Sequence, residues 1–196
     1  MANMRNRLII IIGIVVLICI LGSCSYNSMV AKDENVRAKW GAVQSQYQRR
    51  ADLIPNLVET VKGAANFEKS TLVDVTNARA RATSIQVDPT KLNPETVQKF
   101  QAAQGQLTSA LSRLLVASEN YPTLRANENF TALQAQLEGT ENRINVARID
   151  FNNAVQDYNT TIRSFPAVIT ARLFGFNEQG SFQAEAGASV APKVSF

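Results

Sequence analysis

The stretch FTALQAQLEGTENRINVARIDFNNAVQDYNTTIRSF, residues 130–165, decides the fold of this chain. Large apolar side chains recur at every seventh residue along it, and a second set of residues fills another position of the same heptad. Val155, Ile162 and Ile169 widen this apolar seam beyond what a two-stranded coiled coil needs. The pattern predicts a long helix within a bundle, and Pro166 predicts a kink or a division close to its end. The first heptad position holds Phe130, Leu137, Ile144, Phe151, Tyr158 and Phe165, and the second holds Leu133, Thr140, Ala147, Ala154, Thr161 and Val168.

The chain before this helix also has helical periodicity. Apolar residues spaced by four, three and four positions indicate one face of a helix, and they are Val36, Trp40, Val43 and Tyr47. Pro55 disfavours helix at the residue before it, so we expect a kink or a helix restart there, with Asp52 as the cap. The apolar stripe then continues to about residue 86.

Turns that contain proline separate the remaining helices. Residues 87–94 read VDPTKLNP and form the first clear turn, after which Pro94 opens a helix that ends near Asn120. A division of the first arm near Pro55 or Gly63 gives four long helices, and an undivided arm gives three. Because short connections make neighbouring helices antiparallel, we predict an all-α antiparallel bundle of three to four long helices behind an N-terminal membrane helix.

The predicted membrane segment is LIIIIGIVVLICIL, residues 8–21, which has no polar side chain and follows Arg5 and Arg7. At ~1.5 Å per residue it covers about 21 Å of a ~30 Å hydrocarbon layer. Three interpretations stay open: a retained single-pass helix that continues into residues 22–30, a lipoprotein signal that ends at an acylated Cys24, or a cleaved signal peptide. We favour the retained helix. The arginines before it favour a cytoplasmic N-terminus, which leaves the bulk of the chain outside the cytoplasm.

Composition argues against several classes of function. The 196 residues include 20 Lys and Arg against 16 Asp and Glu, with no dense basic block, so we expect no nucleic-acid partner. The chain has no histidine, which removes the commonest general base and the commonest zinc ligand. It also has no Gly-rich phosphate loop and no Gly-x-Ser-x-Gly motif. We therefore expect no catalytic, cofactor-binding or metal-binding residues and no enzymatic activity.

Arg49 and Arg50, with Asp52 close by, form the most charged short cluster. Arginine binds carboxylates and phosphates through a planar fork of donors, so this pair is a candidate contact for an anionic partner. In the alternative, which we favour, one arginine lies on the bundle surface and the other pairs with Glu138 or Glu141 of the last helix.

Two more groups of residues have both a functional and a structural interpretation. Residues 53–58, LIPNLV, are an exposed docking edge or a helix corner packed into the core, and we prefer the corner. Asn152, Asn153 and Asn159 lie beside the apolar seam. They form either a ligand site or a set of buried amides that fixes the register of the helix, and we prefer the second interpretation.

Longer motifs make the chain similar to a known family. The residues that carry the similarity are Tyr26, Asn27, Val36, Trp40, QRRADLIPNLVETVKG at 48–63, YPTLRANENFTALQAQLEGTENRI at 121–144, ARIDFNNAVQDYNTTIRSFP at 147–166 and GF at 175–176. Together they resemble the LemA family over residues 24–180. The resemblance implies a bacterial protein with an antiparallel helical bundle behind one membrane segment, and it implies no established enzymatic activity. The lipobox-like Cys24 departs from the plain membrane helix of many relatives.

We therefore expect a membrane anchor in residues 1–26, a LemA-like helical bundle in residues 27–177 and a disordered tail in residues 178–196, where Gly, Ala, Ser and Gln dominate. The predicted function is a non-enzymatic scaffold or adaptor at the membrane of the bacterial cell envelope. Its partners are the membrane and an unidentified protein or a second copy of itself. The alternative is a lipid-binding or membrane-remodelling module that acts by self-association.

Overall fold

The computed structural model describes residues 2–63 and 67–183, and every regular element within these ranges is a helix. The prediction of an all-α protein is confirmed. The long helices are α1 (Ala2–Lys62), α2 (Lys69–Ser84), α3 (Pro94–Ser118) and α5 (Glu128–Arg163), and the short ones are α4 (Pro122–Arg125) and α6 (Ala167–Phe174).

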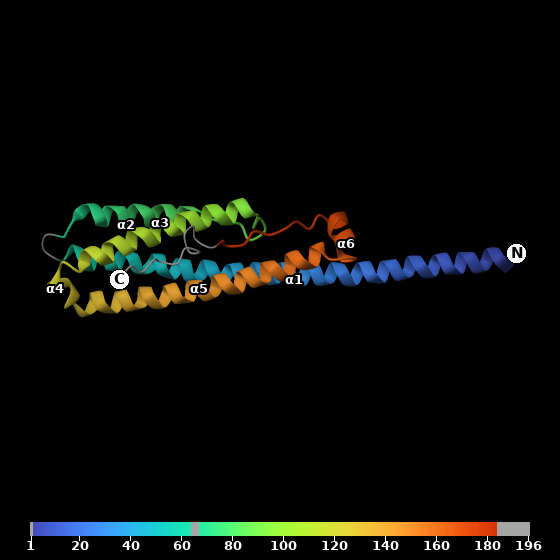
Figure 1. The fold of residues 1–196 in the computed structure, drawn as a ribbon, viewed down its shortest axis with the longest axis horizontal. Helices are drawn as coiled ribbons and strands as arrows, with labels where there is room; N and C mark the ends of the chain where they lie inside the picture. The colour runs from blue at the N-terminus through green and yellow to red at the C-terminus, as the bar shows by residue number, and fades with distance from the viewer. Residues whose placement is uncertain (1, 64–66, 184–196) are drawn as a thin grey trace, which may run out of the picture.

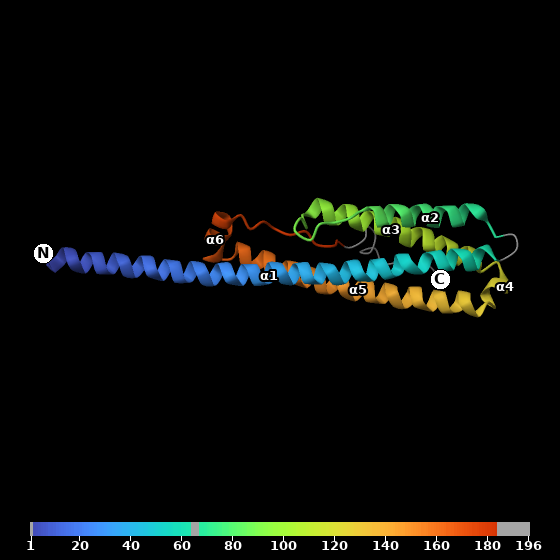
Figure 2. The ribbon, with the colours of Figure 1, turned by 180° about the vertical axis from the view of Figure 1, so that it is seen from behind.

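The four long helices form an antiparallel bundle, seen from opposite sides in Figures 1 and 2. α1 packs mainly along α5, and α2 forms a hairpin with α3. At its N-terminal end α1 extends past the other helices, and α6 folds back there against α1 and α5 (Figure 1). The first arm divides after Lys62, close to Gly63, and this gives the four-helix form of the predicted bundle.

Pro55 lies inside α1, so the predicted helix restart is wrong. Proline has no N–H, and the carbonyl oxygen of Ala51 therefore loses its usual donor within the helix. Arg79 of α2 supplies a donor instead, with its Nε at 2.8 Å from the Ala51 oxygen. Asp52 caps no helix start and accepts a hydrogen bond from Gln48 at 2.7 Å. A donor from a neighbouring helix thus satisfies the carbonyl group that the proline leaves free, and α1 continues.

The buried side chains form two apolar clusters along the bundle axis. The Trp40 cluster lies toward the N-terminal end of the bundled part of α1 and includes Tyr47, Phe100, Ile144 and Phe151. The Leu57 cluster lies toward the C-terminal end of α1 and includes Ile54, Leu107, Phe130 and Leu137. Ile54, Leu57 and Val58 are buried in the second cluster. The prediction that residues 53–58 pack into the core is therefore confirmed for these three side chains, but the predicted corner is wrong, because the residues lie within the continuous helix α1. Each large side chain buried in this way contributes about 1.5–3 kcal/mol.

Asparagine side chains cap two of the long helices. Asn93 Oδ1 accepts a hydrogen bond from the backbone N–H of Thr96 at 2.8 Å, at the start of α3. Asn127 Oδ1 accepts one from the backbone N–H of Asn129 at 2.9 Å, at the start of α5. Such caps satisfy N–H groups that have no partner within the helix, and each contributes about 1 kcal/mol.

The apolar seam of α5 stops at Ile162, earlier than the heptads predict. Ile162 is buried, whereas Phe165 is 82% exposed and Ile169 is 62% exposed. α5 ends at Arg163, as the following proline predicts, and α6 begins at Ala167. The change of direction between the two helices moves the next heptad positions off the core, and two large apolar side chains face outward.

The segment after α6 packs against the bundle up to residue 183. Phe182 is 5% exposed, and its ring centroid lies 5.9 Å from that of Trp40 and 5.5 Å from that of Phe151. The structure thus departs from the disorder predicted for residues 178–196 over the first six of them, because side chains of the helices bind their backbone. Residues 184–196 lie outside the described residues.

Within the ranges that the structure describes, no helix combines the length and the apolar character that a membrane span requires. The N-terminal membrane helix and the anchor in residues 1–26 stay predictions.

Candidate functional site

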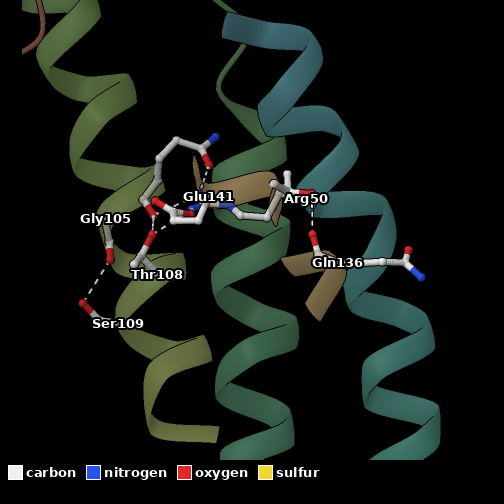
Figure 3. A network of polar contacts seen from close by, with 8 residues as sticks. Arg50, Gly105, Thr108, Ser109, Gln136 and Glu141 are labelled. Carbon is white, nitrogen blue, oxygen red and sulfur yellow. Dashed lines mark hydrogen bonds and ion pairs between the residues drawn. The ribbon is translucent and has the colours of Figure 1, made fainter. Parts of the chain in front are cut away.

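A polar layer around Arg50 crosses the bundle between the two apolar clusters (Figure 3). The Arg50 side chain on α1 is 2% exposed. One terminal nitrogen of its guanidinium donates to Thr108 Oγ1 of α3 at 2.8 Å and to Glu141 Oε2 of α5 at 2.9 Å. The other donates to Gln104 Oε1 at 2.8 Å, and Gln104 donates to the carbonyl oxygen of Ala82 on α2 at 3.3 Å. One arginine therefore links the four long helices.

The Arg50 layer also fixes how the helices align along the axis. Arg50 on α1, Gln104 on α3 and Glu141 on α5 each lie in sequence between a member of the Trp40 cluster and a member of the Leu57 cluster. The flanking pairs are Tyr47 and Ile54 on α1, Phe100 and Leu107 on α3, and Ile144 and Leu137 on α5. A helix that slid by one turn would place a charge or an amide among apolar side chains, which costs several kcal/mol. The layer thereby opposes sliding.

The structure supports the structural interpretation of the arginine pair. Arg50 pairs with Glu141, and Arg49 is exposed on α1. Glu138, the other acidic candidate, accepts a hydrogen bond from Gln134 at 3.1 Å. Since Arg50 is occupied by partners within the chain, only Arg49 remains as a candidate contact for an external anion.

One titratable side chain within the Trp40 cluster, that of Tyr158, has a strongly shifted pKa. Burial raises the pKa of Tyr158 to about 12, and the negative charge of Asp33 adds to this effect. The Tyr158 hydroxyl donates to the carbonyl oxygen of Asn177 at 3.1 Å. The phenol therefore stays protonated at neutral pH and acts as a hydrogen-bond donor. Over the described part of the chain, no group of three or more His, Cys, Asp or Glu residues lies close enough together to hold a metal ion.

Three side-chain amides, which we name the amide cradle, hold the segment after α6 by its backbone. Each amide binds both backbone groups of one tail residue: it donates to the carbonyl oxygen of that residue and accepts from its N–H, at 2.8–3.1 Å. The pairs are Asn159 with Gln179, Asn152 with Phe182 and Gln101 with Gln183. Because these bonds involve only the backbone of the segment, they fix its position without selecting its side chains.

At two positions of the segment, Gly180 and Phe182, the packing does depend on the residue type. The N–H of Gly180 donates to the carbonyl oxygen of Leu92 at 2.7 Å, and a Cβ at this glycine would lie 2.6 Å from the Cα of Pro94. Phe182 fills the space beside Trp40, and the guanidinium of Arg148 lies 4.9 Å from its ring centroid. The segment needs a glycine at position 180 because a Cβ there would overlap the backbone of Pro94. It needs a large aromatic residue at position 182 to fill the space beside Trp40.

The amide cradle corrects part of the sequence-based view of the asparagines. The structural interpretation expects buried amides that fix the register of the helix, whereas Asn152 and Asn159 are half-buried and bind the backbone of the tail. Asn153 is exposed. Sequence analysis missed Gln101, because nothing in a polar helix position indicates a partner 82 residues away.

The N-terminal end of the bundle carries an apolar surface. Four large side chains of α6 and the turn before it, which we name the α6 patch, are exposed: Phe165 (82%), Ile169 (62%), Leu173 (77%) and Phe174 (59%). An open, mainly apolar hollow of about 820 Å³ lies between this helix and residues 22–27 of α1. The Tyr26 ring packs edge-on against Phe174 at 5.0 Å. Cys24 is an exposed free thiol on the same part of α1, and its acylation stays a prediction.

Comparisons with known proteins show which proteins the chain is similar to. The LemA family model matches residues 39–196. Magnetosome protein MamQ 2 of Paramagnetospirillum magneticum is 27% identical over 179 residues, which cover 81% of this chain and 64% of that protein. Magnetosome protein MamQ of Magnetospirillum gryphiswaldense is 27% identical over 172 residues, which cover 77% of this chain and 62% of that protein. Protein LemA of Metamycoplasma hominis is 22% identical over 158 residues, which cover 81% of this chain and 68% of that protein.

The chain spans somewhat less than two thirds of the length of the magnetosome relatives it matches. The family model covers most of the chain, including the Arg50 layer and the amide cradle. The protein therefore belongs to the LemA family.

Proposed function

We propose that this LemA-family protein is a non-enzymatic scaffold or adaptor, held at the membrane of the bacterial cell envelope by its N-terminal apolar segment. The observation that carries the proposal is α1 itself. This helix continues without interruption from the apolar run at residues 8–21 into the Trp40 cluster, so the segment and the bundle share one element. Ile9–Ile12 and Val16 are each more than half exposed, so these side chains contribute little to the bundle core.

The hydrogen bonds of the buried and half-buried polar residues support a structural role for the protein. The Arg50 layer and the amide cradle direct their donors and acceptors at the chain's own helices and tail. Such arrangements make a bundle with one register and a fixed outer surface, which suits a protein that positions a partner. The relatives named as magnetosome proteins hint at a membrane location and add nothing about the partner.

The anchoring part of the proposal is tested by fractionation and by mass spectrometry of the mature N-terminus. We expect the full chain to sediment with membranes, to resist alkaline extraction and to keep the residues before Cys24. Cys24→Ser should leave both results unchanged. A mature chain that begins at an acylated Cys24 would replace the helical anchor by a lipoprotein anchor. A chain with an intact N-terminus in the soluble fraction would refute anchoring altogether.

A second candidate function is membrane remodelling by self-association, and the α6 patch favours it because exposed apolar side chains also suit contacts between copies. The full chain reconstituted in vesicles distinguishes the two. Cross-linking that appears only in vesicles and grows with protein density, together with changes in vesicle shape, would support remodelling. A chain that stays monomeric in vesicles of unchanged shape would leave the scaffold as the function.

A further inference from the structure

We propose that α6 lies on the surface of the lipid bilayer, with the side chains of the α6 patch inserted among the headgroups and the upper parts of the acyl chains. The inference rests on the proposed membrane anchor and adds a second point of contact to it. The bundle would then meet the membrane through two elements, α1 and α6, and its tilt would be defined by both.

The first observation is the composition of the patch. Phe165, Ile169, Leu173 and Phe174 are all large, all more than half exposed, and all belong to one short stretch of chain. Apart from Tyr26, which contacts the patch, the other large apolar side chains exposed on the described part of the bundle are aliphatic and lie on three helices: Val73 on α2, Val116 on α3, and Val146 and Ile149 on α5. Dispersed apolar residues are ordinary on protein surfaces, whereas a concentration of them at one end marks a contact site.

The second observation is that α6 has two distinct faces. Ala171 is 3% exposed and belongs to the Trp40 cluster, so this side of the helix is fixed to the bundle. Ile169 and Leu173, four residues apart and therefore on one side of the helix, are each more than half exposed and border the open hollow between α6 and α1. Arg172 is exposed beside them, as basic residues often are in helices that lie in a membrane interface.

The third observation is the position of α6 along the axis of α1, relative to the end of the apolar run. This position indicates that the bilayer is what covers the α6 patch. The apolar run ends at Leu21, and Tyr26, which contacts Phe174 and Phe176, follows five residues later. At ~1.5 Å per residue, Tyr26 lies about 8 Å beyond the end of the run. Each polar interfacial layer of a bilayer is about 5–8 Å thick. If the run, about 21 Å long, is centred in the ~30 Å hydrocarbon layer, that layer extends about 4–5 Å past Leu21, so Tyr26 and the α6 side chain that contacts it lie at the boundary between acyl chains and headgroups.

The hollow between α6 and α1 fits the same location. It is lined by Gly22, Ser23 and Ser25 on α1 and by apolar residues such as Pro166 and Leu173 on the other side. Tyr26 stands at its edge with an aromatic ring and a hydroxyl group, the combination that is enriched at membrane interfaces. A mixed apolar and small polar lining suits the boundary between headgroups and acyl chains.

The test uses single-cysteine variants of the full chain in a Cys19→Ala and Cys24→Ser background, each labelled with an environment-sensitive fluorophore. The chain is reconstituted in vesicles of phosphatidylethanolamine and phosphatidylglycerol, with or without lipids that carry a quencher on the upper acyl chain. Leu173→Cys reports on the α6 patch, and Ile169→Cys repeats the measurement on the same face. Ile10→Cys reports on the anchor. Val116→Cys is the matched control, an apolar side chain of similar exposure (64%) on α3.

The expected result is severalfold stronger lipid-borne quenching at Leu173 and Ile169 than at Val116, with Ile10 quenched as well. Quenching at Ile10 with Leu173 and Ile169 both indistinguishable from Val116 would overturn the inference and leave the anchor intact. Loss of quenching at all positions would refute the anchor itself, and the inference with it. A Leu173 label that escapes lipid-borne quenchers but changes its emission with protein density would identify a second copy as the occupant and overturn the bilayer contact. Circular dichroism of each labelled chain verifies that it is folded.

Discussion

Replacing Glu141 by glutamine should destabilise the bundle more than replacing Arg50 by methionine, although both changes break the same ion pair. The difference follows from the unequal burial of the two partners. The Arg50 side chain is 2% exposed, whereas that of Glu141 is 40% exposed. Glu141→Gln leaves a positive charge inside the bundle without its counter-charge. Arg50→Met leaves a carboxylate that water can reach.

The magnitudes follow from the contacts that survive each change. Loss of one partner of a buried ion pair costs about 3–5 kcal/mol, and Gln104 and Thr108 still accept hydrogen bonds from the arginine, so we expect about 3 kcal/mol for Glu141→Gln. In Arg50→Met, methionine replaces most of the volume, and the main cost is the unpaired oxygen of Gln104, about 1–2 kcal/mol. Once the arginine is absent, Glu141→Gln should add almost nothing. The double variant should therefore resemble Arg50→Met.

The assay is thermal and chemical unfolding of the full chain in detergent micelles, followed by far-UV circular dichroism. For a chain of this size 1 kcal/mol shifts the Tm by about 2–4 °C, so Glu141→Gln should lower it by about 6–12 °C. Arg49→Met and Glu138→Gln are exposed controls and should stay within about 0.5 kcal/mol of the parent. A larger loss for Arg50→Met than for Glu141→Gln, or additive losses in the double variant, would refute the reasoning.

Three further predictions concern other contacts. Arg79→Met removes the donor that serves the carbonyl group left free by Pro55 and should cost about 1–3 kcal/mol in unfolding experiments; adding Pro55→Ala should restore most of the loss, and no rescue would contradict the explanation. Gly180→Ala should detach the tail segment, because its Cβ would meet backbone at 2.6 Å; the emission of Trp40, the single tryptophan, should shift to the red, and an unchanged spectrum would count against the packing described. The Tyr158 pKa is raised from 10.0 to about 12, so its contribution to stability is full below pH 10.0 and is lost as the pH rises toward 12, by at most about 1.4 kcal/mol per pH unit; the stability of Tyr158→Phe should fall less steeply over this range, and parallel curves would argue against the shift.

The sequence was most informative where a structural feature depends on nearby residues. The heptads of residues 130–165 predict α5 and its buried face as far as Ile162, and Pro94 predicts the start of α3. The pairing of one buried arginine with an acidic residue of the last helix follows from residue type, because arginine in a helical bundle needs a carboxylate. Such features require only local spacing and the general cost of burying charge.

The features that sequence analysis missed depend on residues far apart in the chain. Pro55 predicts a break, but Arg79, 24 positions later, supplies the donor that makes the break unnecessary. The composition of the tail predicts disorder, but Asn152 and Asn159 provide backbone partners that no property of the tail itself reveals. In both cases a polar side chain on a neighbouring helix satisfies a backbone group, and its position becomes known only when the fold is known.

The uninterrupted course of α1 has a mechanical consequence. From Leu21 to Lys62 the helix covers 42 residues, or about 60 Å at ~1.5 Å per residue. It can therefore act as a lever that pivots near Leu21. Its short arm is the apolar run before Leu21, and its long arm is the part of α1 within the bundle. By simple geometry, a change of about 10° in the angle of the short arm moves the distal tip near α4 by about 10 Å. If the proposed anchor holds the short arm in a bilayer, a change in bilayer thickness or lateral tension that tilts this arm would move the end of the bundle near α4.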